Sequence, residues 1–241
     1  MGLPLNLAMT ASEIASVSPL PADFAWMACR FSPDGQGITD LPPQLPAGSL
    51  LILNDSIPCR DHDPDLIAES LLDTVEHFRC CGLLLDLQRP KTDEAAAVVD
   101  ALVNALPCPV AVPPEYAARL PCPVFLPPAP LHQSLESYLK PWQNREIWLE
   151  AALCQEEITV TKNGTSNRSI FPAQQRDGGF YDKRLHCRYH TAVSDDHITF
   201  TLFDTWESLE KKLELAAELG VTRAVGLWQE LGTFLTGKQS A

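Results

Sequence analysis

Residues Cys80 to Pro90 read CCGLLLDLQRP, and this stretch decides how the rest of the chain is interpreted. Gly82 to Leu85 form a short apolar run that ends in the carboxylate of Asp86, the amide of Gln88 and then Arg89. Such a run, followed at once by polar side chains, is typical of a fully buried parallel strand. In parallel α/β folds the functional loops follow the carboxyl ends of the strands, so we expect Asp86 and Gln88 at that end.

Composition argues against several classes of partner. The chain has 241 residues, of which 45% are hydrophobic, and a net charge of −13. Nucleic acids and anionic membranes both require clustered Lys and Arg, so we expect neither as a partner. No apolar run reaches the roughly 18 residues of a membrane-spanning helix, and residues 1–10 lack the features of a signal peptide. We therefore expect a cytoplasmic protein, whose oligomeric state the sequence does not indicate.

The cysteines and histidines do not form a recognisable site. The eight cysteines include no C-x-x-C pair, and the six histidines are scattered. Cys29, Cys81, Cys122 and Cys154 lie in or beside apolar runs, so we interpret them as small buried residues in a reducing compartment. No glycine-rich phosphate loop follows a strand, and we expect neither a metal nor another cofactor.

Short apolar runs alternate with amphipathic helices through most of the chain. We predict buried strands at 24–31, 49–53, 82–85, 109–112, 123–126, 146–153 and 223–228. Helices are predicted to begin near Asp63, Thr92 and Ser134, and at the capping box Asp204 to Glu207. This alternation indicates an α/β fold, and right-handed crossovers then leave either an open doubly wound sheet or a closed barrel.

Residues 155–202 interrupt this alternation. Glu157 to Thr161 alternates in polarity before Asn163-Gly164, which is the strongest short hairpin signal. A second hairpin is predicted around Ser194 to Asp196, so this segment reads as an antiparallel insert. Within it, we interpret His186, Arg188 and His190 as one solvated strand face. The predicted domains are an N-terminal arm (1–22), a barrel-like domain (23–154 and 203–241) and the insert (155–202).

The stretch at 81–88 resembles a motif of the family 18 glycoside hydrolases, the chitinase-like enzymes. That family carries D-G-x-D-x-D-x-E on barrel strand 4, where this chain reads CGLLLDLQ. Gly82 and Asp86 match the motif. Cys81 and Leu84 replace its first two Asp residues, and Gln88 replaces the terminal Glu.

The C-terminal segment carries a second resemblance to the same family. An acidic strand end, a helix with Ser and Lys, a Leu-Gly turn and a strand containing Gly and Trp follow the insert in that order. The matching residues are Asp204, Ser208, Lys211 or Lys212, Gly220, Gly226, Trp228 and Gly232. The pattern is most similar to the spore-cortex and cell-wall branch of the family. It implies a TIM-barrel-like fold over roughly residues 49–235, although we count only about seven parallel strands, which leaves closure open.

The resemblance also implies a mechanism that this chain is poorly equipped to perform. In family 18 enzymes the substrate's acetamido oxygen attacks the anomeric carbon. In the family, the Asp that corresponds to Asp86 holds that acetamido group. The Glu that corresponds to Gln88 is the proton donor. An amide cannot act as a carboxylic acid, and loss of a general acid costs about 10²–10⁴ in rate. We therefore expect a non-catalytic, carbohydrate-binding relative whose partner is an N-acetylated glycan or a peptidoglycan fragment.

Candidate ligand-binding residues lie at or near the predicted strand ends. They are Asp86, Gln88, Trp228, Asn54, Asp55, Arg30, Glu115 and Glu150. Trp228 matches the family's Trp at the floor of the sugar site, and its alternative role is that of a core residue. Asp86 could instead pair with Arg89 or cap a loop. Two other functions stay open: a glycosidase whose acid has moved to Glu115 or Glu150, and a scaffold protein without a ligand.

Overall fold

The structure is a computed structural model that describes residues 2–18, 20–21, 23–35, 37–59, 62–174, 176 and 178–238. Eight parallel strands form its main sheet, in the order β6-β5-β4-β2-β1-β14-β8-β7. They are β1 (Leu5–Met9), β2 (Phe24–Phe31), β4 (Leu50–Asn54), β5 (Gly82–Asp86), β6 (Val110–Ala111), β7 (Val124–Leu126), β8 (Ile147–Glu150) and β14 (Val221–Leu227). A short strand, β3 (Ile38–Thr39), pairs antiparallel with β2.

The two ends of this sheet meet, so that the barrel is nearly closed. A parallel bridge joins Val112, just after β6, to Val124 of β7. Val112 N–H donates to the carbonyl of Pro123 at 3.1 Å, and Phe125 N–H donates to the carbonyl of Val112 at 2.8 Å. The predicted α/β, TIM-barrel-like class is therefore confirmed.

The strand that the sequence did not reveal is β1. Its residues were expected in an N-terminal arm, but they pair with β14 on one side and β2 on the other. The polar Asn6 interrupts the apolar run, and it is buried because its side-chain oxygen accepts a hydrogen bond from Arg223 Nη1 at 2.7 Å. Counting β1 makes β5 the fourth strand of the barrel, which is the place that the family motif implies.

Helices cover the outside of the barrel. They are α1 (Ala11–Ser16), α2 (Pro64–Phe78), α3 (Asp93–Ala105), α4 (Pro114–Ala117), α5 (Leu135–Leu139), α6 (Trp206–Glu218) and α7 (Trp228–Lys238), with a 3-10 turn at Lys140–Trp142. The α2 helix begins as predicted, because the carboxylate of Asp63 accepts from Asp65 N–H and Pro64 is the first helical residue. Ile67, Leu71 and other apolar residues of α2 are buried against the strands.

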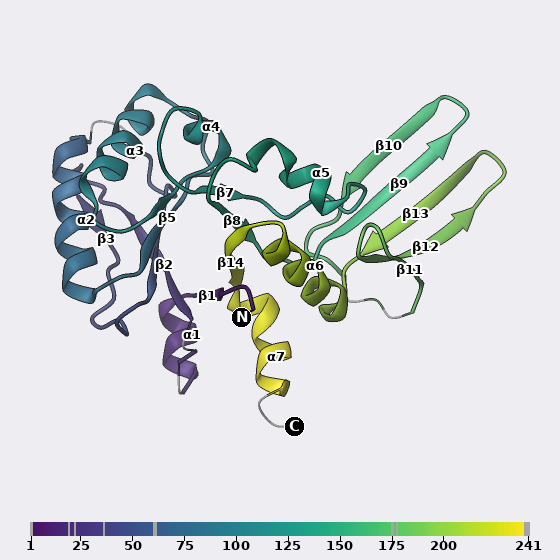
Figure 1. The fold of residues 1–241 in the computed structure, drawn as a ribbon, viewed down its shortest axis with the longest axis horizontal. Coiled ribbons are helices and arrows are strands. Elements are labelled where there is room, and N and C mark those ends of the chain that lie inside the picture. Colours follow the sequence, from purple (N-terminus) through teal and green to yellow (C-terminus); the bar gives the residue numbers. More distant parts are fainter. Residues whose placement is uncertain are drawn as a thin grey trace.

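The antiparallel insert has the predicted hairpins. It consists of β9 (Gln155–Thr161), β10 (Gly164–Ser169), β11 (Phe180–Asp182), β12 (Cys187–Val193) and β13 (His197–Phe203), in the order β10-β9-β13-β12-β11. Figure 1 shows these green strands projecting away from the barrel. His190 stacks on the buried Phe203 with ring centroids 5.2 Å apart, and Arg188 pairs with Glu207 of α6. The face that carries them is therefore packed in part, and our interpretation of it as simply solvated was wrong.

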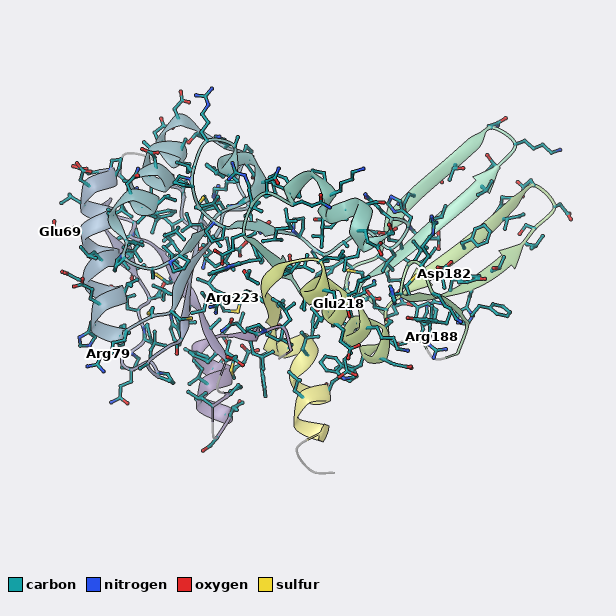
Figure 2. All side chains as sticks on the ribbon, in the orientation of Figure 1. Glu69, Arg79, Asp182, Arg188, Glu218 and Arg223 are labelled. Carbon is teal, nitrogen blue, oxygen red and sulfur yellow. The ribbon has the colours of Figure 1, made fainter. Side chains whose placement is uncertain are left out.

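The inside of the barrel is filled by apolar side chains. Leu50, Leu84, Trp148 and Val225, from four different strands, belong to one buried cluster there. The guanidinium of Arg223 lies 4.8 Å from the centre of the Trp148 ring, among these side chains (Figure 2). Leu84 occupies a position where the family motif has an Asp, so the charge that would adjoin Asp86 is replaced by hydrocarbon.

The cysteines are free in the part of the chain that the structure describes. Cys29 and Cys122 are buried as predicted, whereas Cys81 and Cys154 are half-buried. Burial raises the pKa of Cys29 and of Cys154 to about 12, which keeps both thiols protonated and unreactive. Among the described residues, no helix combines the length and hydropathy that crossing a membrane requires.

Candidate functional site

The carboxyl end of the barrel brings three of the predicted residues into one row. Arg30 of β2 is in register with Asn54 of β4, and Asn54 is in register with Asp86 of β5. Residues in register on parallel strands project to the same side of the sheet. The structure therefore places Arg30, Asn54 and Asp86 side by side at the barrel mouth, as the strand ends predicted.

Asn54 is held by the backbone around it. Its side-chain amide donates to the carbonyls of Met27 and Cys29, at 3.2 and 3.0 Å. Its oxygen accepts from Ser56 N–H at 3.1 Å. These bonds fall where the register of β2 and β4 shifts. Asn54 thus stabilises the irregular end of β2, and its amide nitrogen is already committed to backbone acceptors.

Asp55 positions the loop that follows β5. Its carboxylate is buried, with a residue exposure of 7%, and accepts from the N–H groups of Gln88 and Arg89 at 2.9 and 2.8 Å. The Arg89 guanidinium donates back to the carbonyls of Asp55 and Ser56. Asp55 is therefore a positioning residue, and these contacts direct Arg89 toward Asp55 and Ser56 instead of Asp86.

Asp86 and Gln88 contact each other directly. The side-chain amide of Gln88 donates a hydrogen bond to Oδ1 of Asp86. Asp86 is half-buried and Gln88 is exposed. A carboxylate in this setting can accept an N–H or O–H from a ligand, while the Gln88 amide can both donate and accept. The pair can bind a polar ligand, but Gln88 cannot deliver the proton that bond cleavage would need.

Glu150 ends β8 on the same side of the barrel as Asp86. Burial raises the pKa of Glu150 to about 7, with smaller contributions from the negative charges of Asp86 and Glu230. Its surroundings are tight, because Pro128, Ala129 and neighbouring residues leave a space of only about 20 Å³ beside it. Glu150 thus has the pKa of a general acid, and it is half-buried beside the loop after β7.

Arg30 and Glu115 have partners of their own. Arg30 pairs with Asp40, and both side chains are partly exposed. Together with Trp26 and Asn54 they line a cavity of about 610 Å³. Glu115 is exposed on the short α4 helix, where its carbonyl accepts from Lys91 Nζ at 2.7 Å. The structure gives Glu115 no contact with the row at the mouth.

Trp228 begins α7 instead of ending the last strand. A Cβ added to Gly232, one turn later, would lie 2.7 Å from the Trp228 ring, so the ring covers that glycine. The ring packs with the apolar clusters between the barrel strands and the helices, and not with the cluster inside the barrel. This placement corresponds to the alternative role of a core residue.

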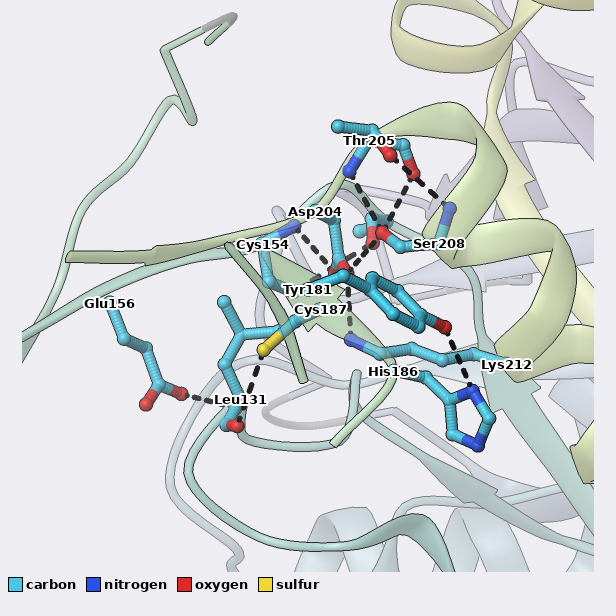
Figure 3. Close-up of polar contacts among 11 residues, drawn as sticks. Leu131, Cys154, Glu156, Tyr181, His186, Cys187, Asp204, Thr205, Ser208 and Lys212 are labelled. Atoms are coloured by element: carbon cyan, nitrogen blue, oxygen red, sulfur yellow. Dashed lines mark hydrogen bonds and ion pairs between the residues drawn. The ribbon is translucent and has the colours of Figure 1, made fainter. Parts of the chain in front are cut away.

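The sequence did not single out a buried network where the insert joins the barrel (Figure 3). The Asp204 carboxylate accepts from Lys212 Nζ at 2.8 Å, from Ser208 Oγ at 2.9 Å and from Cys154 N–H at 3.3 Å. Asp204 N–H in turn donates to the carbonyl of Cys154 at 2.9 Å. The chain enters the insert beside Cys154 and leaves it at Asp204, so this network fixes both ends of the insert to α6. Three of the residues were noted only as matches to the family pattern.

Over the described ranges, the structure contains no cluster of three or more His, Cys, Asp or Glu side chains that could hold a metal ion.

Comparison with known proteins identifies the fold. No family model matches the chain, and no curated protein is similar enough in sequence to match. Among solved structures, a family GH18 chitinase from Cycas revoluta in complex with allosamidin is 11% identical, with a TM-score of 0.57 over 93% of this chain and 94% of that chain. A variant of that chitinase in complex with (GlcNAc)4 gives the same values. The spore cortex-lytic enzyme SleL of Bacillus cereus is 12% identical, with a TM-score of 0.50 over 93% of this chain and 70% of that chain.

These similarities show that the chain has a family 18 glycoside hydrolase-like fold, related to that of the spore-cortex enzymes. The predicted resemblance is thereby confirmed at the level of the fold. What the chain binds or catalyses has to be argued from its own residues.

Proposed function

We propose that this chain is a non-catalytic carbohydrate-binding protein that holds an N-acetylated glycan or a peptidoglycan fragment at the carboxyl end of its barrel. One observation carries the proposal: an amide, Gln88, occupies the place of the proton donor on the fourth strand and hydrogen-bonds to the retained Asp86. The fold is similar to that of a chitinase, and the proposal infers a glycan ligand from this similarity.

The residues around this pair support binding more than cleavage. Asp55 holds the backbone of Gln88 in place, so the pair is presented by a fixed loop. Asp86 offers a partly exposed acceptor for the N–H of an acetamido group. Glu150, a nearby acid, is half-buried beside the loop around Pro128 and Ala129, in a space of only about 20 Å³. A site that can orient a sugar but cannot protonate its leaving oxygen binds without turnover.

Calorimetry tests the proposal with (GlcNAc)4 and with muropeptides as probes. We expect heat on titration of at least one probe, a higher melting temperature in its presence, and an intact glycan by mass spectrometry afterwards. Asp86→Ala should abolish the heat, whereas Asp65→Ala, which changes an exposed Asp on α2, should not. Absence of both heat and a melting shift for every glycan would refute the proposal.

A second candidate function is a glycosidase that uses Glu150 as its acid. The observation that favours it is the pKa of about 7, which suits a group that donates a proton near neutral pH. Turnover of an aryl glycoside that disappears in Glu150→Gln and in Asp86→Ala, but survives in Glu115→Gln, would establish it. Absence of turnover across a broad panel of glycosides would rule out this second function.

A further inference from the structure

A larger cavity lies between the insert and the two helices that follow it. Its volume is about 720 Å³, within the range of roughly 300–1,000 Å³ that is usual for small-molecule sites. Its walls come from the segment between β10 and β11, from the start of α6 and from the first turns of α7. Neither Asp86 nor Gln88 contributes to its lining.

Two buried polar atoms in this lining have no hydrogen-bond partner among the described residues. They are Nε of Arg176, on the insert side, and Oε2 of Glu230, on α7. The Glu230 carboxylate also accepts from Leu153 N–H, and burial raises the pKa of Glu230. Buried donors and acceptors are almost always paired, and an unpaired one is costly. The cavity therefore contains one unpaired hydrogen-bond donor and one unpaired acceptor.

The cavity also has an aromatic wall. Trp206, at the start of α6, stacks on Phe234 of α7 with ring centroids 5.4 Å apart and planes 3° from parallel. Both side chains line the cavity. Rigid aromatic rings of this kind bind the apolar faces of ligands at low cost in conformational entropy.

The surrounding contacts hold the walls in place before any ligand binds. Asp204 and Lys212 form a buried ion pair at the base of α6. Arg188 of β12 lies 3.6 Å from the carboxylate of Glu207 of α6 and donates to the carbonyl of Gly178, so it links the insert to the helix. A preformed site loses less entropy when it binds than one that must first close.

We propose that this cavity is a second saccharide-binding site, at the rim of the barrel and lined by residues other than Asp86 and Gln88. A sugar hydroxyl both accepts and donates, so neighbouring hydroxyls can accept from Arg176 Nε and donate to Glu230 Oε2. The apolar face of the sugar ring then packs on Trp206 and Phe234. This inference rests on the proposed function, because it presumes that the chain binds glycans.

Titration of (GlcNAc)4 into the wild type and three variants tests it. Glu230→Gln keeps the size of the side chain and changes its charge, Arg176→Gln removes the guanidinium, and Asp86→Ala changes the mouth. We expect Glu230→Gln and Arg176→Gln each to weaken binding about tenfold, the effect of about 1.4 kcal/mol. Melting temperatures of the free variants should equal that of the wild type, which separates lost binding from lost folding.

The outcomes distinguish the two sites. Binding that survives in Asp86→Ala and is weakened in both Glu230→Gln and Arg176→Gln supports the second site and argues against the mouth. Weakening in all three supports both sites. Binding that is lost in Asp86→Ala and unchanged in the other two overturns the second site and leaves the mouth proposal standing. No binding by the wild type overturns both.

Discussion

Two adjacent lysines on α6 provide a direct test of what holds the insert to the barrel. Lys212 pairs with Asp204 at 2.8 Å, and the two side chains are only 12% and 1% exposed. Lys211 pairs with Glu207 at the same 2.8 Å, but those side chains are 43% and 63% exposed. Both lysines lie on α6, and both pairs join an ammonium to a carboxylate at the same distance, so the clearest difference between them is burial. Replacement of each lysine by Met keeps the apolar stem and the helix propensity.

The expected magnitude follows from the environment of Asp204. Lys212→Met leaves the buried Asp204 carboxylate with Ser208 Oγ and Cys154 N–H as its donors among the described residues. Removing one partner of a buried ion pair costs about 3–5 kcal/mol. For a chain of this size, each kcal/mol lowers the melting temperature by about 2–4 °C, so we expect a fall of about 6–20 °C. Lys211→Met should have the same melting temperature as the wild type, because exposed ion pairs contribute little to stability.

Thermal unfolding followed by circular dichroism measures both variants under the same conditions. The double variant Asp204→Asn with Lys212→Met should recover much of the loss, because the uncompensated buried charge is then gone. If Lys212→Met and Lys211→Met melt within a degree or so of each other, the reasoning about burial is wrong.

Three further predictions concern the barrel itself. Gly82→Ala should destabilise the fold by about 1–3 kcal/mol in urea unfolding, because its new Cβ would lie 2.8 Å from the Trp148 ring; stability equal to the wild type would contradict this packing. Asp55→Ala should speed hydrogen exchange at the amide of Gln88 while Leu83 stays protected, and unchanged exchange would show that the carboxylate does not hold the loop. The pKa of Glu150 rises on folding from 4.5 to about 7, so the protonated form is favoured in the folded state and stability falls as pH rises between those values. Glu150→Gln should therefore melt higher than the wild type at pH 8 and lose this pH dependence; a pH profile that matches the wild type would refute the shift.

Local patterns predicted most of the barrel. The run from Gly82 to Asp86 is a buried parallel strand, and the alignment of its end with Asn54 follows from parallel pairing. The hairpin at Asn163-Gly164 also forms where the turn residues place it. These features depend on residues that are close in sequence or on the geometry of a parallel sheet.

What the sequence did not reveal depends on distant partners. Asn6 lies inside the barrel because it binds Arg223, 217 residues later, and no local pattern marks that contact. Trp228 fits the family spacing, but a helix begins at that residue and its ring packs against Gly232. Glu230 and Arg176 line one cavity only because the insert folds back over α7. Such contacts are set by tertiary structure and not by periodicity.

The most direct measurement is a crystal structure of this protein grown with (GlcNAc)4. The proposed function predicts an uncleaved glycan at the carboxyl end of the barrel, with an acetamido group hydrogen-bonded to Asp86 beside the amide of Gln88. A cleaved glycan, or a barrel mouth that stays empty while the protein shows no binding in solution, would contradict it.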